Sequence, residues 1–187
     1  MPEQAATDNR NVLQRYQDFR TRRFLKNEKT WSAALPSWRT RRRRHSLVIA
    51  VALSFVVMAT TAVLCALGVP LAALLWLVAC ALFFPSWTAL QIVSSRQGDA
   101  PEAALDEFEV AQRNNARSIG LTITQYLMLI PIGYLLIGAI HGLGEVEVVA
   151  YAGALMVLTV LMIGGCSPAM ILAWVRPDPD PEDDPRR

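Results

Sequence analysis

Charged residues are absent from four long stretches of this 187-residue chain. The stretches cover residues 47–67, 71–93, 119–140 and 148–175, and they hold 21, 23, 22 and 28 residues without an Asp, Glu, Lys or Arg. A helix needs about 20 apolar residues to cross the hydrocarbon core of a bilayer. A backbone in lipid must also satisfy its own hydrogen bonds, which favours helices over open strands. The sequence therefore predicts an all-α fold, a four-helix transmembrane bundle made of two antiparallel hairpins.

Positive charge is missing from two of the segments that connect these spans. Residues 68–70 and 141–147 contain no Lys or Arg, whereas 12 of the 18 positive residues precede the first span, three lie between the second and third, and three follow the fourth. Flanks that are rich in Lys and Arg stay in the cytoplasm. We therefore predict a multi-pass protein of the plasma membrane whose N- and C-termini are both cytoplasmic. The first apolar run starts only after 46 residues, too late for a cleavable signal peptide.

Residues that usually carry catalysis or bind metals are also scarce. The chain has two histidines, and the predicted topology puts His45 and His141 on opposite sides of the membrane. The three cysteines, Cys65, Cys80 and Cys166, all lie inside spans. They form no Cys-x-x-Cys pair, and no histidine lies at a spacing typical of a metal site. No Gly-rich phosphate loop is present. No span contains an Asp, Glu, Lys or Arg that would mark ion-coupled transport. We predict a protein that is not an enzyme and that holds no metal or cofactor.

Residues 1–46 form a basic N-terminal segment that admits two interpretations. Arginines with tryptophans on the other face are typical of a helix that lies in the interface of an anionic leaflet, although Pro36 interrupts such a helix. The alternative is a solvated basic tail that only fixes the orientation. The predicted membrane-interface residues are Trp31, Trp38, Arg41, Arg42, Arg43 and Arg44. We do not predict nucleic-acid binding, because the arginine run adjoins the membrane and no recognition fold surrounds it.

Residues 101–118 carry most of the charge between the second and third spans, and we predict that they form a cytoplasmic helix that extends the third span. Pro101 suits the first turn of a helix, and the acidic residues precede the basic ones, as the helix dipole favours. Four charged side chains share one stripe and are the predicted partner-binding residues: Asp106, Glu109, Arg113 and Arg117. The other interpretation is a helix end that is stabilised by its own charges and packs on its own bundle.

The same segment carries a resemblance to a known class of proteins. Residues 105–120, LDEFEVAQRNNARSIG, resemble the Leu-Asp-Glu-Arg-Glu…Arg…Ala segment that precedes the third span of small actinobacterial-type four-span integral membrane proteins, which are uncharacterised. Phe108 departs from this pattern because the family has Arg there. The matching residues are Leu105, Asp106, Glu107, Glu109, Arg113 and Ala116. The resemblance implies a bacterial membrane protein and carries no activity with it.

Small and polar residues within the spans indicate how the helices pack. Gln91 and Gln125 lie near the cytoplasmic ends of the second and third spans, and we expect them to hydrogen-bond between these two spans. The small-xxx-small pattern of close helix packing is present at Gly138 and Gly142 and again at Ala150 and Ala154. Residues 176–187, RPDPDPEDDPRR, alternate proline with acid and are predicted to be a disordered acidic tail.

Two hypotheses on function follow from this pattern. The first is an integral membrane protein of unknown biochemical activity, an accessory protein without catalysis whose cytoplasmic segments bind anionic lipid headgroups or a protein partner. The second is an oligomeric channel or small-solute exporter, in which two or more copies enclose the path because four spans alone enclose little lumen. The expected partners are the lipid bilayer, another protein or a second copy of this chain.

Overall fold

The computed structural model describes residues 19, 40–94, 106–142 and 144–177. Trp31, Trp38 and most of the acidic tail lie outside these residues, as do residues 101–105 of the predicted cytoplasmic helix. The described residues form helices and turns without a β-strand, so the all-α prediction is confirmed for this part of the chain.

The described part of the chain contains four long helices. They are α2 (Arg41–Ala66), α3 (Ala73–Val93), α4 (Glu107–His141) and α5 (Val146–Val175), with a short 3-10 helix, η2 (Pro70–Ala72), before α3. All four are long and apolar enough to cross a membrane. Each contains one of the predicted spans almost entirely, because a run of about 20 uncharged residues leaves no other element that lipid can surround.

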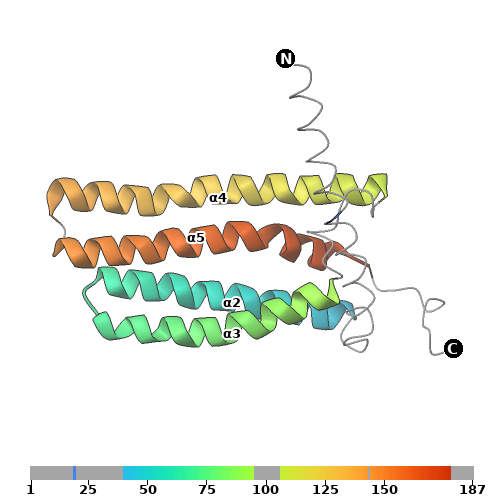
Figure 1. Ribbon diagram of the computed structural model, residues 1–187, viewed down its shortest axis with the longest axis horizontal. Coiled ribbons are helices and arrows are strands. Elements are labelled where there is room, and N and C mark those ends of the chain that lie inside the picture. Colours follow the sequence, from blue (N-terminus) through green and yellow to red (C-terminus); the bar gives the residue numbers. More distant parts are fainter. Residues whose placement is uncertain (1–18, 20–39, 95–105, 143, 178–187) are drawn as a thin grey trace, which may run out of the picture.

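The helices lie side by side in a single row, in the order α4, α5, α2, α3 (Figure 1). α2 and α3 form one antiparallel hairpin and α4 and α5 form the other, with both connecting turns at the same end of the row. The hairpins meet where α2 packs on α5, and α3 touches α5 only briefly. In the most apolar part of each helix, 44% of the residues of α2 and 33% of those of α5 are buried, against 17% for α3 and 11% for α4. α2 and α5 are thus the central helices, and α3 and α4 are the outer ones.

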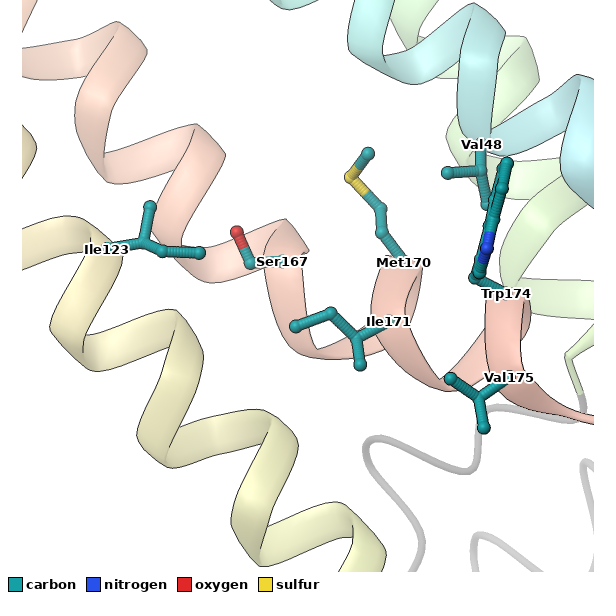
Figure 2. Close-up of a pocket in the computed structure, with 7 residues that line it drawn as sticks. All are labelled: Val48, Ile123, Ser167, Met170, Ile171, Trp174 and Val175. Atoms are coloured by element: carbon teal, nitrogen blue, oxygen red, sulfur yellow. The ribbon is translucent and has the colours of Figure 1, made fainter.

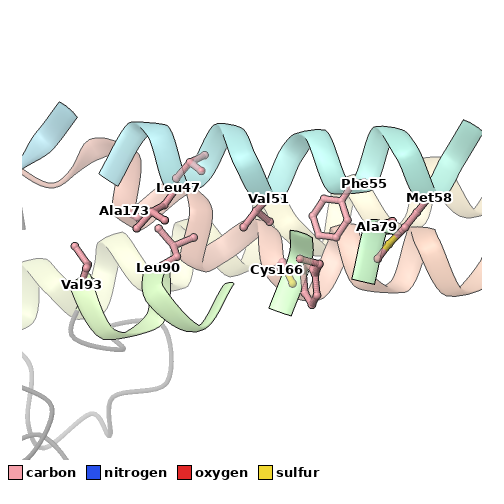
Figure 3. Packing of buried hydrophobic residues seen from close by; sticks show 11 residues of the cluster. Leu47, Val51, Phe55, Met58, Ala79, Leu90, Val93, Cys166 and Ala173 are labelled. Carbon is pink, nitrogen blue, oxygen red and sulfur yellow. The ribbon is translucent and has the colours of Figure 1, made fainter. Parts of the chain in front are cut away.

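The core lies along one face of α2. Buried residues recur there at spacings of three and four, which is the period that places side chains on one face of a helix. This face meets α3 on one side and α5 on the other (Figure 3). The largest cluster consists of Leu47, Val48, Val51, Phe55, Met58, Ala79, Phe83, Leu90, Val93, Cys166 and Ala173. The rings of Phe55 and Phe83 lie 5.6 Å apart and join α2 to α3 within it.

Glycines bring α4 and α5 close together. A Cβ atom at Gly164 would collide with the side chain of Thr124, and one at Gly153 would collide with Leu135. A Cβ at Gly138 would lie 2.6 Å from Cγ1 of Val149. Side chains of each helix therefore fill holes over the glycines of the other, as small residues allow in membrane helices. Gly138 thus takes part in close helix packing, and its partner is Val149 of α5 in the same chain.

The ends of α4 are fixed by specific residues. Asp106 has an extended backbone, and its carboxylate accepts a hydrogen bond of 2.7 Å from the backbone N–H of Glu109. This N-cap makes α4 begin at Glu107, and the predicted helix start at residue 101 lies outside the described residues. At the other end Gly142 has φ = 61° and caps the helix in the left-handed conformation, so it terminates α4 and is no packing partner of Gly138.

Candidate functional site at the arginine-rich end

All arginines in the described part of the chain lie at one end of the row. α2 starts with four of them, α4 carries two in its first 11 residues, and one follows the last residue of α5. These three helix ends lie together at the end of the row opposite the connecting turns (Figure 1). The opposite end carries Glu145, Glu147 and His141. The arginine-rich end also carries Asp106, Glu107 and Glu109, so it has a net positive charge, whereas the opposite end has a net negative charge.

Arg44 is buried and holds the C-terminus of α5. Its side chain is 2% exposed. Its Nη2 donates hydrogen bonds to the carbonyl oxygens of Arg176, at 2.7 Å, and Pro177, at 2.9 Å. These carbonyls stand at the negative end of the α5 dipole, where a cation is favourable. The guanidinium of Arg44 therefore binds the protein and is not presented to lipid headgroups.

Arg176 extends this arrangement to the third helix. Its Nη1 donates a hydrogen bond of 3.1 Å to the carbonyl oxygen of Ser94, the C-cap residue of α3. Beside it, Nε2 of His45 donates to the carbonyl oxygen of Trp174 at 3.1 Å, and the two rings stack with centroids 3.9 Å apart. The side chains of Arg44, Arg176, His45 and Trp174 thus hold the ends of α2, α3 and α5 together, and His45 has a structural role in these contacts.

The other three residues of the arginine run differ from Arg44. Arg41, Arg42 and Arg43 are exposed. The sequence contains the signal for this division, because Arg44 continues the spacing of the buried face of α2 through Leu47 and Val51. The prediction of four equivalent interface arginines, Arg41 to Arg44, missed this division.

The predicted stripe on α4 is divided by burial as well. Asp106 and Arg117 are exposed and Glu109 is half-buried, whereas Arg113 is 6% exposed. The two exposed residues lie at and near the start of α4. This helix has 35 residues and is about 52 Å long. The hydrocarbon core of a bilayer is only about 30 Å thick. The charged first part of α4 thus extends beyond the length that lipid needs.

An apolar groove lies beside α5 near the same end (Figure 2). Its volume is about 390 Å³. The lining residues come from α2, α4 and α5: Val48, Ile123, Ser167, Met170, Ile171, Trp174 and Val175. The hydroxyl of Ser167 donates to the carbonyl oxygen of Ile163 at 2.6 Å and is therefore already bonded within its own helix. The groove could accommodate an apolar group, but its lining side chains provide no acid, base or activated nucleophile.

The remaining chemically reactive residues are dispersed. His45 and His141 lie at opposite ends of the row. Cys65 and Cys166 are buried and Cys80 is half-buried, and all three are free thiols. In the described ranges no three His, Cys, Asp or Glu side chains gather closely enough to hold a metal ion.

The predicted hydrogen bond between the second and third spans is wrong. Gln91 belongs to α3 and Gln125 to α4, and these are the two outer helices of the row, separated by α2 and α5. The physical reason is that α4 pairs with α5 through the fitted glycines, which leaves α3 with no access to α4. Gln125 instead stands exposed on the outside of α4.

The chain matches no family model, no curated protein and no solved structure. The resemblance of residues 105–120 to small actinobacterial-type membrane proteins therefore stays a prediction.

Proposed function

We propose that this chain is a plasma-membrane protein with both termini in the cytoplasm, and that it acts as an accessory protein without catalysis through its arginine-rich end. The observation that carries this proposal is the gathering of all seven described arginines at one end of four membrane-length helices. Positive charge resists translocation, so this end belongs in the cytoplasm. At this end α4 also extends beyond the length that is needed to cross the hydrocarbon core.

Two surfaces at this end are suited to binding. Arg41, Arg42 and Arg43 begin α2 just before its apolar part, and we expect them to lie at the depth of the lipid headgroups. An arginine near an anionic leaflet contributes about 1 kcal/mol to binding. The second surface is the projecting start of α4, where Asp106 and Arg117 are exposed. We propose that the first surface holds anionic lipid and the second docks a cytoplasmic partner protein.

The orientation can be tested by cysteine labelling of intact cells. The background variant has the three native cysteines replaced by alanine. We expect a membrane-impermeant maleimide to label Glu145→Cys from outside and to leave Arg43→Cys unlabelled until the membrane is opened. Both positions lie in exposed parts of the described chain, so access through the membrane is the variable tested. Labelling of Arg43→Cys in intact cells would overturn the proposed orientation.

The docking surface can be tested with a photo-crosslinking amino acid in living cells. We place it at Arg117 and, as a control on the same helix, at Ile137, which is 49% exposed. The expected result is a discrete protein adduct from Arg117 and none from Ile137. The same adducts from both positions, or no adduct from Arg117, would contradict partner binding through the start of α4. Loss of the adduct in an Asp106→Asn variant, which keeps a side chain able to cap α4 and removes the negative charge, would identify the charge as the determinant.

The second hypothesis, a channel or exporter, receives less support from the arrangement of the described helices. Four helices in one row have no common interior, so a solute path would require surfaces of more than one copy. We therefore retain the accessory role as the proposed function.

A further inference from the structure

One face of α4 carries an uninterrupted run of exposed, uncharged residues at alternating spacings of three and four. This spacing is that of the contact seam of a left-handed helix pair. We call these ten positions the α4 seam: Phe108, Ala111, Asn115, Ser118, Thr122, Gln125, Leu129, Ile132, Leu136 and Ala139. The charged residues of α4 all lie off the seam, at Glu107, Glu109, Arg113 and Arg117. The seam runs along nearly the whole helix and contacts nothing in the described chain that would bury it.

The composition of the seam differs from that of a surface made only for lipid. The exposed residues of α3, the other outer helix, are mainly large and apolar: Leu74, Leu75, Leu77, Val78, Leu82 and Phe84. The seam has the same character only in its outer half, from Leu129 onward. Its cytoplasmic half is more polar, with Ser118, Thr122 and Gln125. The hydroxyl of Thr122 donates to the carbonyl oxygen of Ser118 at 2.9 Å within α4, whereas the amide of Gln125 has no such bond within the described ranges. Lipid tails cannot hydrogen-bond this amide, whereas a neighbouring helix can.

Gln125 makes this point most clearly. It lies 16 residues before His141, which is about 24 Å from the outer end of α4 at 1.5 Å per residue. That position is within the roughly 30 Å thickness of the hydrocarbon core. Within the described ranges no residue forms a hydrogen bond with its amide. The amide is therefore a donor and acceptor pair that faces apolar surroundings in the single chain.

Gly133 is a second and independent indication of contact. It flanks the seam next to Ile132 and sits in the interior of α4, where glycine is unfavourable compared with alanine. A Cβ atom added there would meet nothing within 4 Å, so packing inside the chain does not require a glycine. The glycines that face α5 behave in the opposite way. A small residue at this place leaves room for another backbone to approach from outside.

We propose that the α4 seam is the interface of a parallel homodimer. Two copies inserted in the same orientation are related by a twofold axis along the membrane normal, and this places each seam residue opposite its own copy. The seam is compatible with itself, because it carries no charge and because an amide can both donate to and accept from an identical amide. A single polar residue at such a position also fixes register and oligomeric state, as buried Asn does in coiled coils. This inference requires only that α4 crosses the membrane and does not depend on the proposed accessory role.

Disulfide crosslinking in native membranes tests the geometry of the interface. Leu129 and Ile130 are neighbours on α4 and almost equally exposed, at 63% and 61%, but Ile130 lies off the seam. In the background without native cysteines, we expect Leu129→Cys to form a covalent dimer under mild oxidation and Ile130→Cys to remain monomeric. Random collisions in the membrane would crosslink both variants equally. Equal crosslinking, or none in Leu129→Cys, would overturn the proposal.

Dimer affinity in lipid tests the role of the amide. Energy transfer between labelled copies, measured over a range of protein-to-lipid ratios, gives the dissociation constant. We expect Gln125→Leu to weaken the dimer about 3- to 10-fold, the size of one hydrogen bond between membrane helices. Gln91→Leu is the matched control, because it removes the same amide from the opposite outer helix, and we expect it to leave the constant unchanged. An unchanged or lower dissociation constant in Gln125→Leu, or equal effects of both substitutions, would overturn the proposal.

Discussion

Replacing Gly164 with alanine should destabilise the protein, whereas the same replacement at Gly165 should not. The two glycines are neighbours in α5, but Gly164 is buried against α4 and Gly165 is exposed. A Cβ at Gly164 would collide with the hydroxyl of Thr124 and lie 2.9 Å from its Cβ. A Cβ at Gly165 would have nothing within 4 Å. The pair of variants therefore separates the packing of α4 on α5 from the intrinsic effect of glycine on the helix.

The expected difference follows from two contributions. Inserting a methyl group into a well-packed interface costs about 1–3 kcal/mol. Replacing glycine with alanine in a helix interior gains about 0.5–1 kcal/mol. The helix gain is common to both variants, so the difference between them isolates the packing cost of about 1–3 kcal/mol. Thr124 cannot easily turn away, because its hydroxyl donates to the carbonyl oxygen of Gly120 at 2.7 Å.

The free energy of unfolding of both variants can be measured by reversible denaturation of the purified protein in mild detergent, with helicity as the signal. We expect Gly164→Ala to unfold more easily than the wild type and Gly165→Ala to be equal to it or slightly more stable. A difference between the two variants of less than about 0.5 kcal/mol, well below the expected packing cost, would refute the close approach of α4 and α5.

Two further predictions concern the arginine-rich end. Arg44→Met removes two hydrogen bonds from a buried guanidinium to the end of α5 and should lower the free energy of unfolding by about 2–4 kcal/mol; Arg42→Met, which removes the same charge at an exposed position, should change it little, and equal losses would show that net charge matters and the contact does not. Asp106→Ala removes the N-cap of α4 and should cost about 1 kcal/mol; hydrogen exchange of the first turn should become faster, and unchanged exchange would contradict the cap.

The spans were predictable because the absence of charge over 20 or more residues is a strong signal with few competing explanations. The N-cap of α4 was not predicted, because Asp106 stood out as a member of the charged stripe and its capping role depends on the backbone conformation. The burial of Arg44 could have been predicted from the spacing of the apolar residues of α2. It was missed because Arg44 belongs to a run of four arginines.

The order of the helices in the row could not be predicted from any single segment. It depends on which helix fits which, and that is decided by shapes such as Thr124 over Gly164. The expected pairing of Gln91 with Gln125 failed for this reason, since polarity shows that a residue needs a partner and does not show where the partner is.

The central place of α5 has a consequence for how the protein is made. α5 is synthesised after the other three helices, yet it is the helix on which both α2 and α4 pack. Until Val146–Val175 enters the membrane, α4 lacks the helix on which it packs and Arg44 lacks the carbonyl groups of Arg176 and Pro177. The hairpin of α2 and α3 can form early, but assembly of the whole must wait for the final insertion. Ribosomes that stall before residue 146 would therefore leave an incomplete protein with an unpaired helix, a natural target for membrane quality control.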